Sequence, residues 1–149
     1  MKDKIDQIAI ASDHAGFEFK EYIKLNINKL GYNVKDFGTF SSDRVDYPDL
    51  IHPLASAVNS GIFKMGIILC GSGNGVAMVA NKYKGVRAAV CWNEEITKLA
   101  RLHNNANILA LPARFITESL AFELVKIFLT TGFEGGRHEL RVAKIQNLI

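Results

Sequence analysis

The sequence predicts an α/β protein, a single domain in which a five-stranded parallel sheet lies between two layers of helices. Two observations lead to this prediction. Short apolar runs alternate five times with stretches of helical periodicity. The runs are apolar on both faces, as in parallel strands that helices cover on each side. A length of 149 residues suits one domain with its own core, so residues 1–149 are expected to form one unit.

Each element has its own signal in the sequence. Strands are predicted where short apolar runs meet turn residues, over 8–12, 33–37, 66–70, 86–91 and 107–111. A helix is predicted after the first strand, where apolar residues recur at helical spacing and a glycine follows: Phe19, Ile23, Ile27, Leu30 and then Gly31. Another is predicted after the fifth strand, with Thr117 and Glu118 at its start and an apolar stripe of Leu120, Leu124, Ile127 and Phe128. A last helix is predicted over about 136–147. Together these elements predict a three-layer α/β/α sandwich with a Rossmann-like sheet.

Composition and charge exclude several classes of protein. Hydrophobic residues make up 48% and charged residues 22%, which is typical of a globular chain. The net charge of +3 and the lack of aromatic residues among the basic ones argue against nucleic acid as a partner. No apolar run approaches the roughly 18 residues that span a bilayer, and the N-terminus lacks an apolar signal core. A cytoplasmic protein without a membrane partner is expected.

Reactive side chains follow the predicted strands at their carboxyl ends, where open parallel sheets bind ligands. Asp13 and His14 follow the first strand, Cys70 ends the third, and Arg114 follows the fifth. The polar loop 38–48 after the second strand is long, and its length favours a functional role. We therefore expect a carboxylate, an imidazole, a thiol and a guanidinium group at one edge of the sheet.

The glycine-rich loop after the third strand, Gly71-Ser72-Gly73-Asn74-Gly75, has two interpretations. Alternating glycines let successive backbone N–H groups converge on a phosphate or on a developing oxyanion. The alternative is a tight turn into a helix, which needs glycine only for its backbone conformation. A dinucleotide site is disfavoured because the third glycine comes one position early and Val76 stands where the fingerprint needs glycine. A nucleotide triphosphate loop is disfavoured because no Gly-Lys-Ser/Thr follows.

Cys70 lies directly before that loop, and a thiol near a helix N-terminus has its thiolate form stabilised. A cysteine phosphatase would need an arginine at the far end of the loop, where this chain has Val76. Proton abstraction next to a carbonyl group fits better, although a core cysteine that merely ends a strand stays possible. Cys91 is the one other cysteine, and both are expected to be reduced, with no metal-ligand spacing around them.

Basic residues gather near the C-terminus and suit a small anion. Arg137 and Arg141 are four positions apart, which places both on one face of a helix. They form either a clamp for an anion or a solvated basic face, and the spacing does not decide between the two. His103 follows a helical stretch, where a histidine often only compensates the helix dipole.

Taken together, these residues resemble the type B ribose-5-phosphate isomerases and their sugar-phosphate isomerase relatives, which include galactose-6-phosphate isomerase. The resemblance spans about residues 8–141. It rests on six ordered motifs: Ser12-Asp13-His14-Ala15-Gly16, Asp46-Tyr47-Pro48, Cys70-Gly71-Ser72-Gly73-Asn74-Gly75, Ala80-Asn81-Lys82, Arg101-Leu102-His103-Asn104 and Glu134-Gly135-Gly136-Arg137-His138. The resemblance implies interconversion of ribose 5-phosphate and ribulose 5-phosphate without metal or organic cofactor. It also implies a homodimer or a dimer of dimers with shared active sites.

The resemblance also implies a role for each matching residue. Catalytic roles fall on Cys70 as the base, on Ser72 for proton movement between sugar oxygens, and on His103 with Asp13 for ring opening. Contacts to the sugar phosphate fall on ten residues: His14, Tyr47, Gly71, Gly73, Asn74, Gly75, Asn104, Arg114, Arg137 and Arg141. Within the dimer, Cys70 is expected from one subunit, and His103, Asn104 and Arg114 from the other. Some relatives use a glutamate at the position of Val76, so the base in this chain is expected to be Cys70.

Two other functions stay open on the sequence alone. One is isomerisation of a six-carbon sugar phosphate, such as allose or galactose 6-phosphate. The other is a catalytically silent protein that binds sugar phosphates. A nicotinamide dehydrogenase is disfavoured by the spacing of the glycines.

Overall fold

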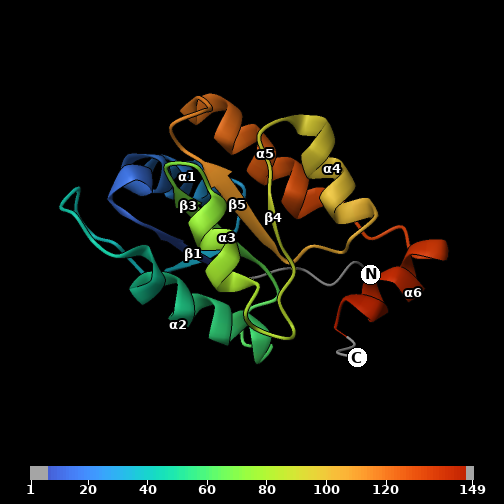
Figure 1. Ribbon diagram of the computed structural model, residues 1–149. Helices are drawn as coiled ribbons and strands as arrows, with labels where there is room; N and C mark the ends of the chain where they lie inside the picture. The colour runs from blue at the N-terminus through green and yellow to red at the C-terminus, as the bar shows by residue number, and fades with distance from the viewer. Residues whose placement is uncertain (1–6, 147–149) are drawn as a thin grey trace.

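The computed structural model describes residues 7–146, and its strands form a single sheet (Figure 1). The order is β2-β1-β3-β5-β4, and all neighbouring strands run parallel. The bounds are β1 Gln7–Ser12, β2 Asn33–Asp36, β3 Gly66–Cys70, β4 Ala88–Val90 and β5 Ile108–Pro112. The predicted five-stranded parallel sheet is confirmed. The bounds of β3 are those predicted, and each end of the other strands lies within two residues of its predicted position.

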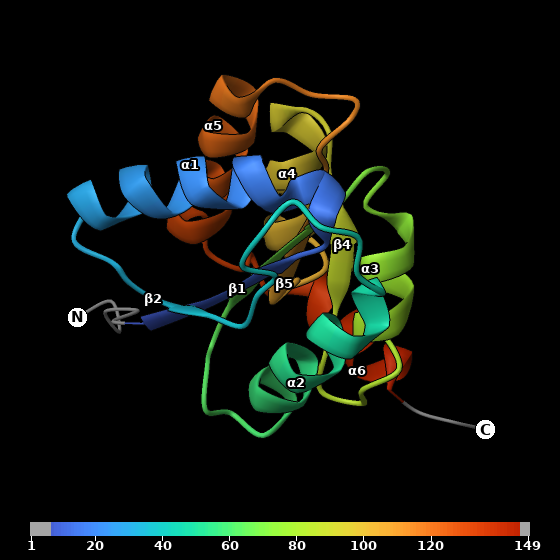
Figure 2. The same cartoon turned by 90° about the vertical axis from the view of Figure 1, so that its left-hand side faces the viewer.

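Helices cover both faces of the sheet. They are the short 3₁₀ helix η1 (His14–Gly16) and six α-helices: α1 Phe17–Lys29, α2 Tyr47–Asn59, α3 Asn74–Ala80, α4 Glu94–Leu102, α5 Glu118–Thr130 and α6 Arg137–Ile145. Figure 2 shows α1, α4 and α5 on one side of the sheet and α2 on the other, and α3 shares a core with α2 on that second face. The predicted three-layer sandwich is confirmed.

Side chains of the central strands point alternately into two cores, which is why these strands are apolar throughout. In β3, Ile67 and Leu69 belong to the core beneath α1 and α5, whereas Ile68 and Cys70 belong to the core beneath α2 and α3. The predicted helix signals also hold. Gly31 has a φ of 88° just after α1, and the Thr117 hydroxyl accepts a hydrogen bond from the Leu120 N–H at the start of α5.

The start of α2 corrects one boundary. The sequence predicted a loop up to Pro48, but α2 begins at Tyr47. Proline is favoured in the first turn of a helix, because its missing N–H group would have no partner there. The polar loop is therefore shorter at its C-terminal end, and Tyr47 is held by a helix.

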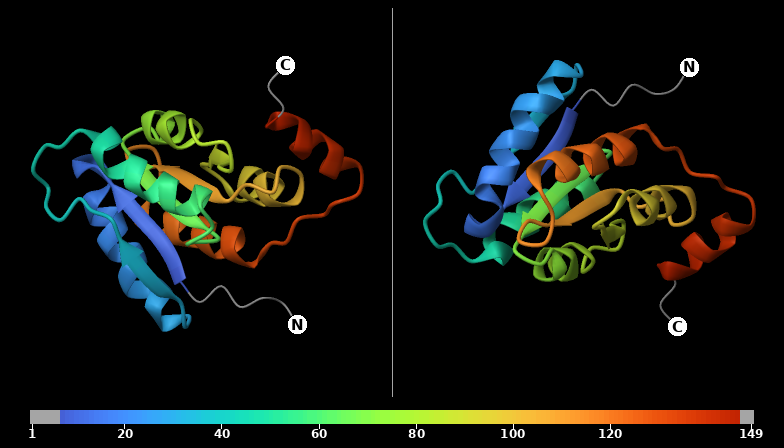
Figure 3. Two further views of the ribbon diagram at one scale, coloured as in Figure 1. Left: turned by 90° about the horizontal axis from the view of Figure 1, so that it is seen from below. Right: turned by 90° about the horizontal axis from the view of Figure 1, so that it is seen from above.

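The helix α6 lies apart from the sandwich, at the end of the extended connection 131–136 (Figure 3). It spans Arg137–Ile145 where the sequence predicted 136–147, and position 147 lies outside the described residues. His138 is its one buried residue, while Leu140 and Ile145 are more than half exposed. Across residues 7–146, no helix has both the length and the apolar character needed to cross a membrane.

A buried charge cluster ties α1 to β2. The Lys20 ammonium group is fully buried and lies 2.5 Å from the Asp36 carboxylate, which Lys24 also contacts at 2.7 Å. The other oxygen of Asp36 accepts the N–H of Gly38 at 2.8 Å, at the start of the polar loop. Burial acts to raise the pKa of Asp36, but these hydrogen bonds outweigh it, and the pKa lies below the ordinary value of 3.8.

Replacing Asp36 is expected to destabilise the fold strongly. Asp36→Asn leaves the ammonium group of Lys20 buried without its closest partner, so we expect a loss of about 3 kcal/mol in the free energy of unfolding by urea. The lowered pKa of Asp36 means that this difference is present above about pH 4. It disappears as the pH falls through the folded-state pKa. Glu21→Gln, which alters a more exposed partner of Lys20 and Lys24 and leaves Asp36 in place, should cost less than about 1 kcal/mol. Equal losses in both variants would contradict this account.

Candidate active site

The carboxyl ends of β1 and β3 meet at the point where the strand order changes direction, the usual ligand position in such sheets. Ser12, the last residue of β1, is in register with Leu69, and Cys70 is in register with Pro112 of β5. Cys70 is therefore the last residue of the central strand, and it is 5% exposed. The predicted position of this thiol at the carboxyl end of the third strand is confirmed.

The glycine loop folds back over the thiol. Gly73 has a φ of 76°, and its N–H group donates to Cys70 Sγ at 3.1 Å. A side chain at Gly73 would lie about 3.3 Å from the backbone of Leu111 and Pro112, so both space and backbone conformation require glycine. The hydroxyl of Ser72 accepts the N–H of Asn74 at 3.3 Å. The loop thus directs one backbone N–H donor at the sulfur, an arrangement that favours a thiolate.

Tyr47 closes one side of this loop. A Cβ atom on Gly75 would lie 2.5 Å from Tyr47 Cζ and 2.7 Å from its hydroxyl oxygen, which shows that the ring lies directly against the glycine. The first turn of α2 therefore brings the phenol group next to the glycine loop. Its role as a substrate contact stays a prediction.

Asp13 and His14 lie beyond the end of β1. The Asp13 carboxylate accepts the N–H groups of Ala15 at 2.9 Å and Gly16 at 3.1 Å, so it caps the start of η1. His14 is half-buried, and its Nδ1 accepts the N–H of Val45 at 3.4 Å. His14, Val45 and the neighbouring Arg44 and Asp46 line a cavity of about 450 Å³.

That cavity includes a residue that the sequence reasoning missed. Arg44 lies in the polar loop, opposite His14, and adds a second basic group to this part of the site. The loop was predicted to be functional because of its length, but nothing in its local sequence distinguished Arg44 from a solvated charge. Its position depends on β2 and α2, which hold the two ends of the loop.

Arg114 lies beside the Cys70 loop, as the rule for strand ends predicted, whereas the resemblance implied a different arrangement. Arg114 was expected to reach the site from a different subunit than Cys70. Instead its N–H donates to the carbonyl of Gly71 at 3.0 Å, and a Cβ atom on Gly71 would lie 3.1 Å from Arg114 Cδ. The pairing of β3 with β5 places the residue after β5 beside the residue after β3. Arg114 therefore belongs to the same cluster as Cys70 in one chain.

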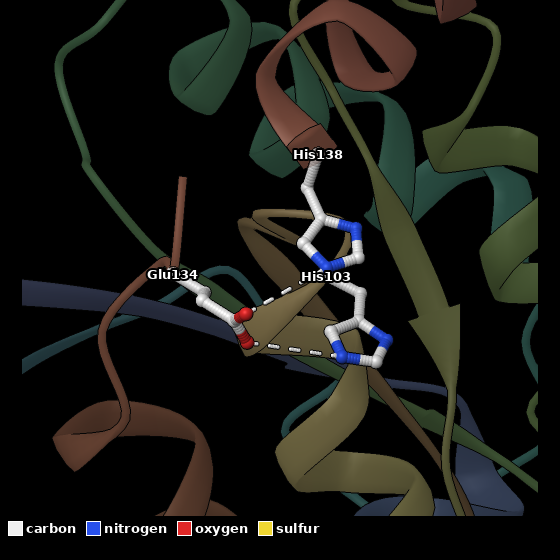
Figure 4. Close-up of side chains that lie close together, drawn as sticks. All are labelled: His103, Glu134 and His138. Atoms are coloured by element: carbon white, nitrogen blue, oxygen red, sulfur yellow. Dashed lines mark ion pairs between the residues drawn. The ribbon is translucent and has the colours of Figure 1, made fainter. Parts of the chain in front are cut away.

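A second cluster forms around His103. His103 follows α4, and its imidazole stacks on that of His138 with ring centres 4.2 Å apart and an interplanar angle of 14°. The Glu134 carboxylate faces both rings, at 3.9 Å from Nε2 of His103 and 4.0 Å from Nε2 of His138 (Figure 4). The hydrogen bond from the Glu134 N–H to the Leu102 carbonyl, at 3.0 Å, fixes the connection 131–136 beside the end of α4.

Basic and amide groups surround this second cluster. Arg137 Nε lies 3.5 Å from Nε2 of His138. Burial lowers the pKa of His138 below 6.5, the positive charges of His103, Arg137 and Arg141 lower it further, and Glu134 alone opposes them. Arg141 lies one turn further along α6.

Asn104 is exposed and lines another cavity, of about 570 Å³, which also touches the end of α6.

The two clusters lie at opposite edges of the sheet. Cys70 is at the carboxyl end of β3, whereas residues 103–107 lead into the start of β5. At that amino-terminal edge the carbonyl of Asn107 accepts the N–H of Gly66, the first residue of β3, at 2.9 Å. Cys70 lies four positions beyond Gly66 along β3, a rise of about 13 Å. One chain therefore does not bring His103 to Cys70.

A family model described as Ribose/Galactose Isomerase matches residues 8–145. The chain belongs to this family. The chain is similar to ribose-5-phosphate isomerase B of Escherichia coli K12, at 41% identity over 139 residues that cover 93% of each chain. It is also similar to the crystal structure of a ribose 5-phosphate isomerase from Thermotoga maritima, with a TM-score of 0.92 and 49% identity, over 96% of this chain and 99% of that one. Ribose-5-phosphate isomerase B from Mycoplasma genitalium with bound ribulose-5-phosphate gives a TM-score of 0.91 and 44% identity, over 94% of this chain and 93% of that one.

In this member of the ribose/galactose isomerase family, the two cysteines differ in their surroundings. Both are free thiols, as the sequence predicted. Burial raises the pKa of Cys91 to about 11, and its sulfur lies in the core beneath α4 and α5. Cys91 is therefore inert at neutral pH, whereas Cys70 lies at the ligand-binding edge with an N–H group donating to it. Val76 is fully buried, as an apolar residue of the core.

Proposed function

We propose that this chain catalyses the interconversion of D-ribose 5-phosphate and D-ribulose 5-phosphate in the cytoplasm, in the non-oxidative branch of the pentose phosphate pathway. The observation that carries the proposal is the Cys70 thiol, held by the Gly73 N–H under a glycine loop at the switch point of the sheet. Family membership and the similarity to a solved isomerase with bound ribulose-5-phosphate support the same reaction. No cofactor takes part in the proposed chemistry.

The first step opens the sugar ring. One group removes the proton from the anomeric hydroxyl, and another donates a proton to the ring oxygen, which leaves a free aldehyde. We assign this step to His103 with Asp13. The two residues lie in different clusters of one chain, so the pair forms only if the clusters of two chains meet.

The second step moves one proton between carbons. The thiolate of Cys70 removes the proton from carbon two of the aldehyde form, and the electron pair forms an enediolate. The same thiol then gives the proton to carbon one, while the hydroxyl of Ser72 helps to move a proton from the oxygen on carbon two to that on carbon one. N–H groups of the glycine loop stabilise the negative charge that develops on these oxygens.

The proposed active unit is a homodimer, or a dimer of dimers, in which each site contains one cluster from each chain. One chain supplies the Cys70 cluster, consisting of Asp13, His14, Tyr47, Cys70, the glycine loop and Arg114. The other supplies His103, Asn104, Arg137 and Arg141. The separation of the two clusters in one chain supports this arrangement, because ring opening and proton abstraction must act on the same sugar. The sugar phosphate then lies between four basic side chains: His14, Arg114, Arg137 and Arg141.

Arg137 and Arg141 are expected to bind the phosphate without taking part in proton transfer. Replacing either by Ala should weaken binding of the phosphorylated sugar by roughly 1.5–3 kcal/mol, the range for a hydrogen bond to a charged group. Inhibition by inorganic phosphate measures this directly, and its inhibition constant should rise in both variants. Lys144→Ala, an exposed cation on the same helix, is the matched control and should change little. A phosphate inhibition constant that stays at the parental value in both arginine variants would contradict the assignment.

The function itself is tested by measuring turnover of ribose 5-phosphate beside allose 6-phosphate and galactose 6-phosphate under identical conditions. We expect the highest kcat/KM with ribose 5-phosphate. A higher kcat/KM with either hexose phosphate would make the chain a six-carbon isomerase that uses the same residues. Tight binding of all three sugars without turnover of any would contradict the proposed catalysis and favour a silent binding protein.

A further inference from the structure

The cluster around His103 has the composition of a metal site. It contains two imidazole groups and one carboxylate, and one possible ligand atom from each of His103, Glu134 and His138 lies within 4.8 Å of the other two (Figure 4). Imidazole nitrogen and carboxylate oxygen are common ligands of Zn²⁺ and of similar divalent ions. Among residues 7–146, this trio is the one group of three such residues with this convergence.

The contacts within the trio are too long to be hydrogen bonds. The carboxylate oxygens of Glu134 lie 3.9 and 4.0 Å from the two Nε2 atoms, beyond the usual 3.2 Å limit for N–H···O contacts. The near-parallel stacking of the two rings still turns both Nε2 atoms toward the same carboxylate. The three groups thus face one another, and no direct hydrogen bond joins the carboxylate to either ring.

We propose that His103, Glu134 and His138 bind a divalent transition-metal ion of the Zn²⁺ class. Metal–ligand bonds of about 2.0–2.1 Å place tetrahedral ligands roughly 3.3 Å apart, so the present separations must shrink by about 0.5–1.5 Å. Glu134 can make its part of this movement, because its side chain is 53% exposed and it precedes two glycines with positive φ, Gly135 and Gly136. The two stacked rings have planes 14° apart, so the partly exposed ring of His103 must also turn before both in-plane nitrogen lone pairs meet at one ion. Three protein ligands leave a fourth position open for water or for an oxygen of the sugar phosphate.

Nearby positive charge limits the affinity of this site. Arg137 Nε lies 3.5 Å from Nε2 of His138, the nitrogen that would bind the ion, and Arg141 follows on the same helix. A cation must move Arg137 aside and bind against its charge. Removing that charge by Arg137→Gln is therefore expected to tighten metal binding, a result that a metal bound elsewhere on the surface would not give.

The functional consequence rests on the proposed role of His103 in ring opening. A metal ion occupies the nitrogen lone pair that His103 would use to accept a proton. Binding of the ion is therefore expected to inhibit the isomerase. The bound state would be a reversible off state in which the Cys70 cluster is unchanged but receives no open-chain sugar.

Binding is tested with Zn²⁺ alone, by calorimetry on Cys70→Ala protein, which removes the thiol at the carboxyl end of β3 as a competing ligand. We expect one ion per chain, at least tenfold weaker binding in Glu134→Gln and His138→Gln, and tighter binding in Arg137→Gln. Glu139→Gln changes an exposed carboxylate on α6 outside the trio and should bind as the parent does. Because His138 is buried, Glu134→Gln gives the decisive result if His138→Gln folds poorly. Unchanged binding in Glu134→Gln, or no binding at all, overturns the metal site.

Inhibition is tested separately, with ribose 5-phosphate and protein that retains Cys70. The rate should fall over the Zn²⁺ range that saturates the site, and Glu134→Gln should need at least tenfold more Zn²⁺ for the same fractional loss of its own metal-free rate. Zn²⁺ binding that depends on Glu134 but does not inhibit the enzyme would overturn the off state and the assigned role of His103. It would leave the metal site established. Zn²⁺ binding that depends on Glu134, in a protein without ribose 5-phosphate isomerase activity even in the absence of metal, would overturn the proposed function alone.

Discussion

Cys70→Ala is expected to lower kcat by several orders of magnitude and to leave binding of the sugar phosphate almost unchanged. The thiol is the proposed base in the chemical step, and the phosphate contacts come from other side chains, so a transition-state interaction is lost without a ground-state one. Steady-state turnover of ribose 5-phosphate gives kcat. Inhibition by inorganic phosphate shows whether the anion site is intact.

Cys91→Ala is the matched control for this experiment. Cys91 is fully buried, and its raised pKa of about 11 keeps it a neutral thiol at neutral pH. Its replacement by Ala removes a single small core group and should leave kcat close to the parental value. Near-parental kcat in Cys70→Ala, in protein with the normal content of helix, would end the role of Cys70 as the base.

Much of the fold could be predicted because its signals are local. The apolar run GIILC followed by alternating glycines placed β3 and its loop as the structure has them. The rule that ligands bind at carboxyl ends of parallel strands brought together Asp13, His14, Cys70 and Arg114. These residues need only the strand order to become neighbours, and the central strands are recognisable from burial on both faces.

The second cluster could not be predicted from local pattern. His103 and Glu134 are thirty-one positions apart in the sequence, and the connection 131–136 has no periodicity that predicts its path. Its position depends on a backbone hydrogen bond to Leu102, on a hydrogen bond from Arg101 Nε to the Thr131 carbonyl at 2.9 Å, and on the stacking of two imidazole rings. His138 and Glu134 were quoted only as part of a motif, and neither was assigned a role.

The assignment of residues to subunits was also beyond the sequence. Arg114 was expected to lie with His103, but the neighbouring ends of β3 and β5 place it against Gly71. In contrast, Arg137 lies beside His138, at the edge of the sheet where the His103 cluster is found. A resemblance indicates which residues meet in a site. Only the topology of one chain shows which of these residues lie close together within that chain.

The central claim is that each active site combines the Cys70 cluster of one chain with the His103 cluster of another. Mixing two inactive variants tests it most directly, after subunit exchange has been confirmed independently. The variants Cys70→Ala and His103→Ala carry their lesions in different clusters. In a mixed dimer, one site then inherits both lesions and the other inherits none.

The corrected position of Arg114 provides an internal control for this mixture. Arg114 lies in the same cluster as Cys70, so Cys70→Ala mixed with Arg114→Ala yields no site free of lesions. That mixture should show no gain over the average of its two components. A gain there would mean that Arg114 acts from the opposite chain, as the family resemblance implied.

The decisive measurement is the rate of ribose 5-phosphate turnover in the exchanged mixture of Cys70→Ala and His103→Ala. Random exchange makes about half of the dimers mixed, and each mixed dimer has one working site of two. The account therefore predicts recovery of roughly a quarter of the parental rate from two nearly inactive proteins. A mixture that remains as inactive as its components, with exchange complete, would show that each chain works alone and would contradict the shared site.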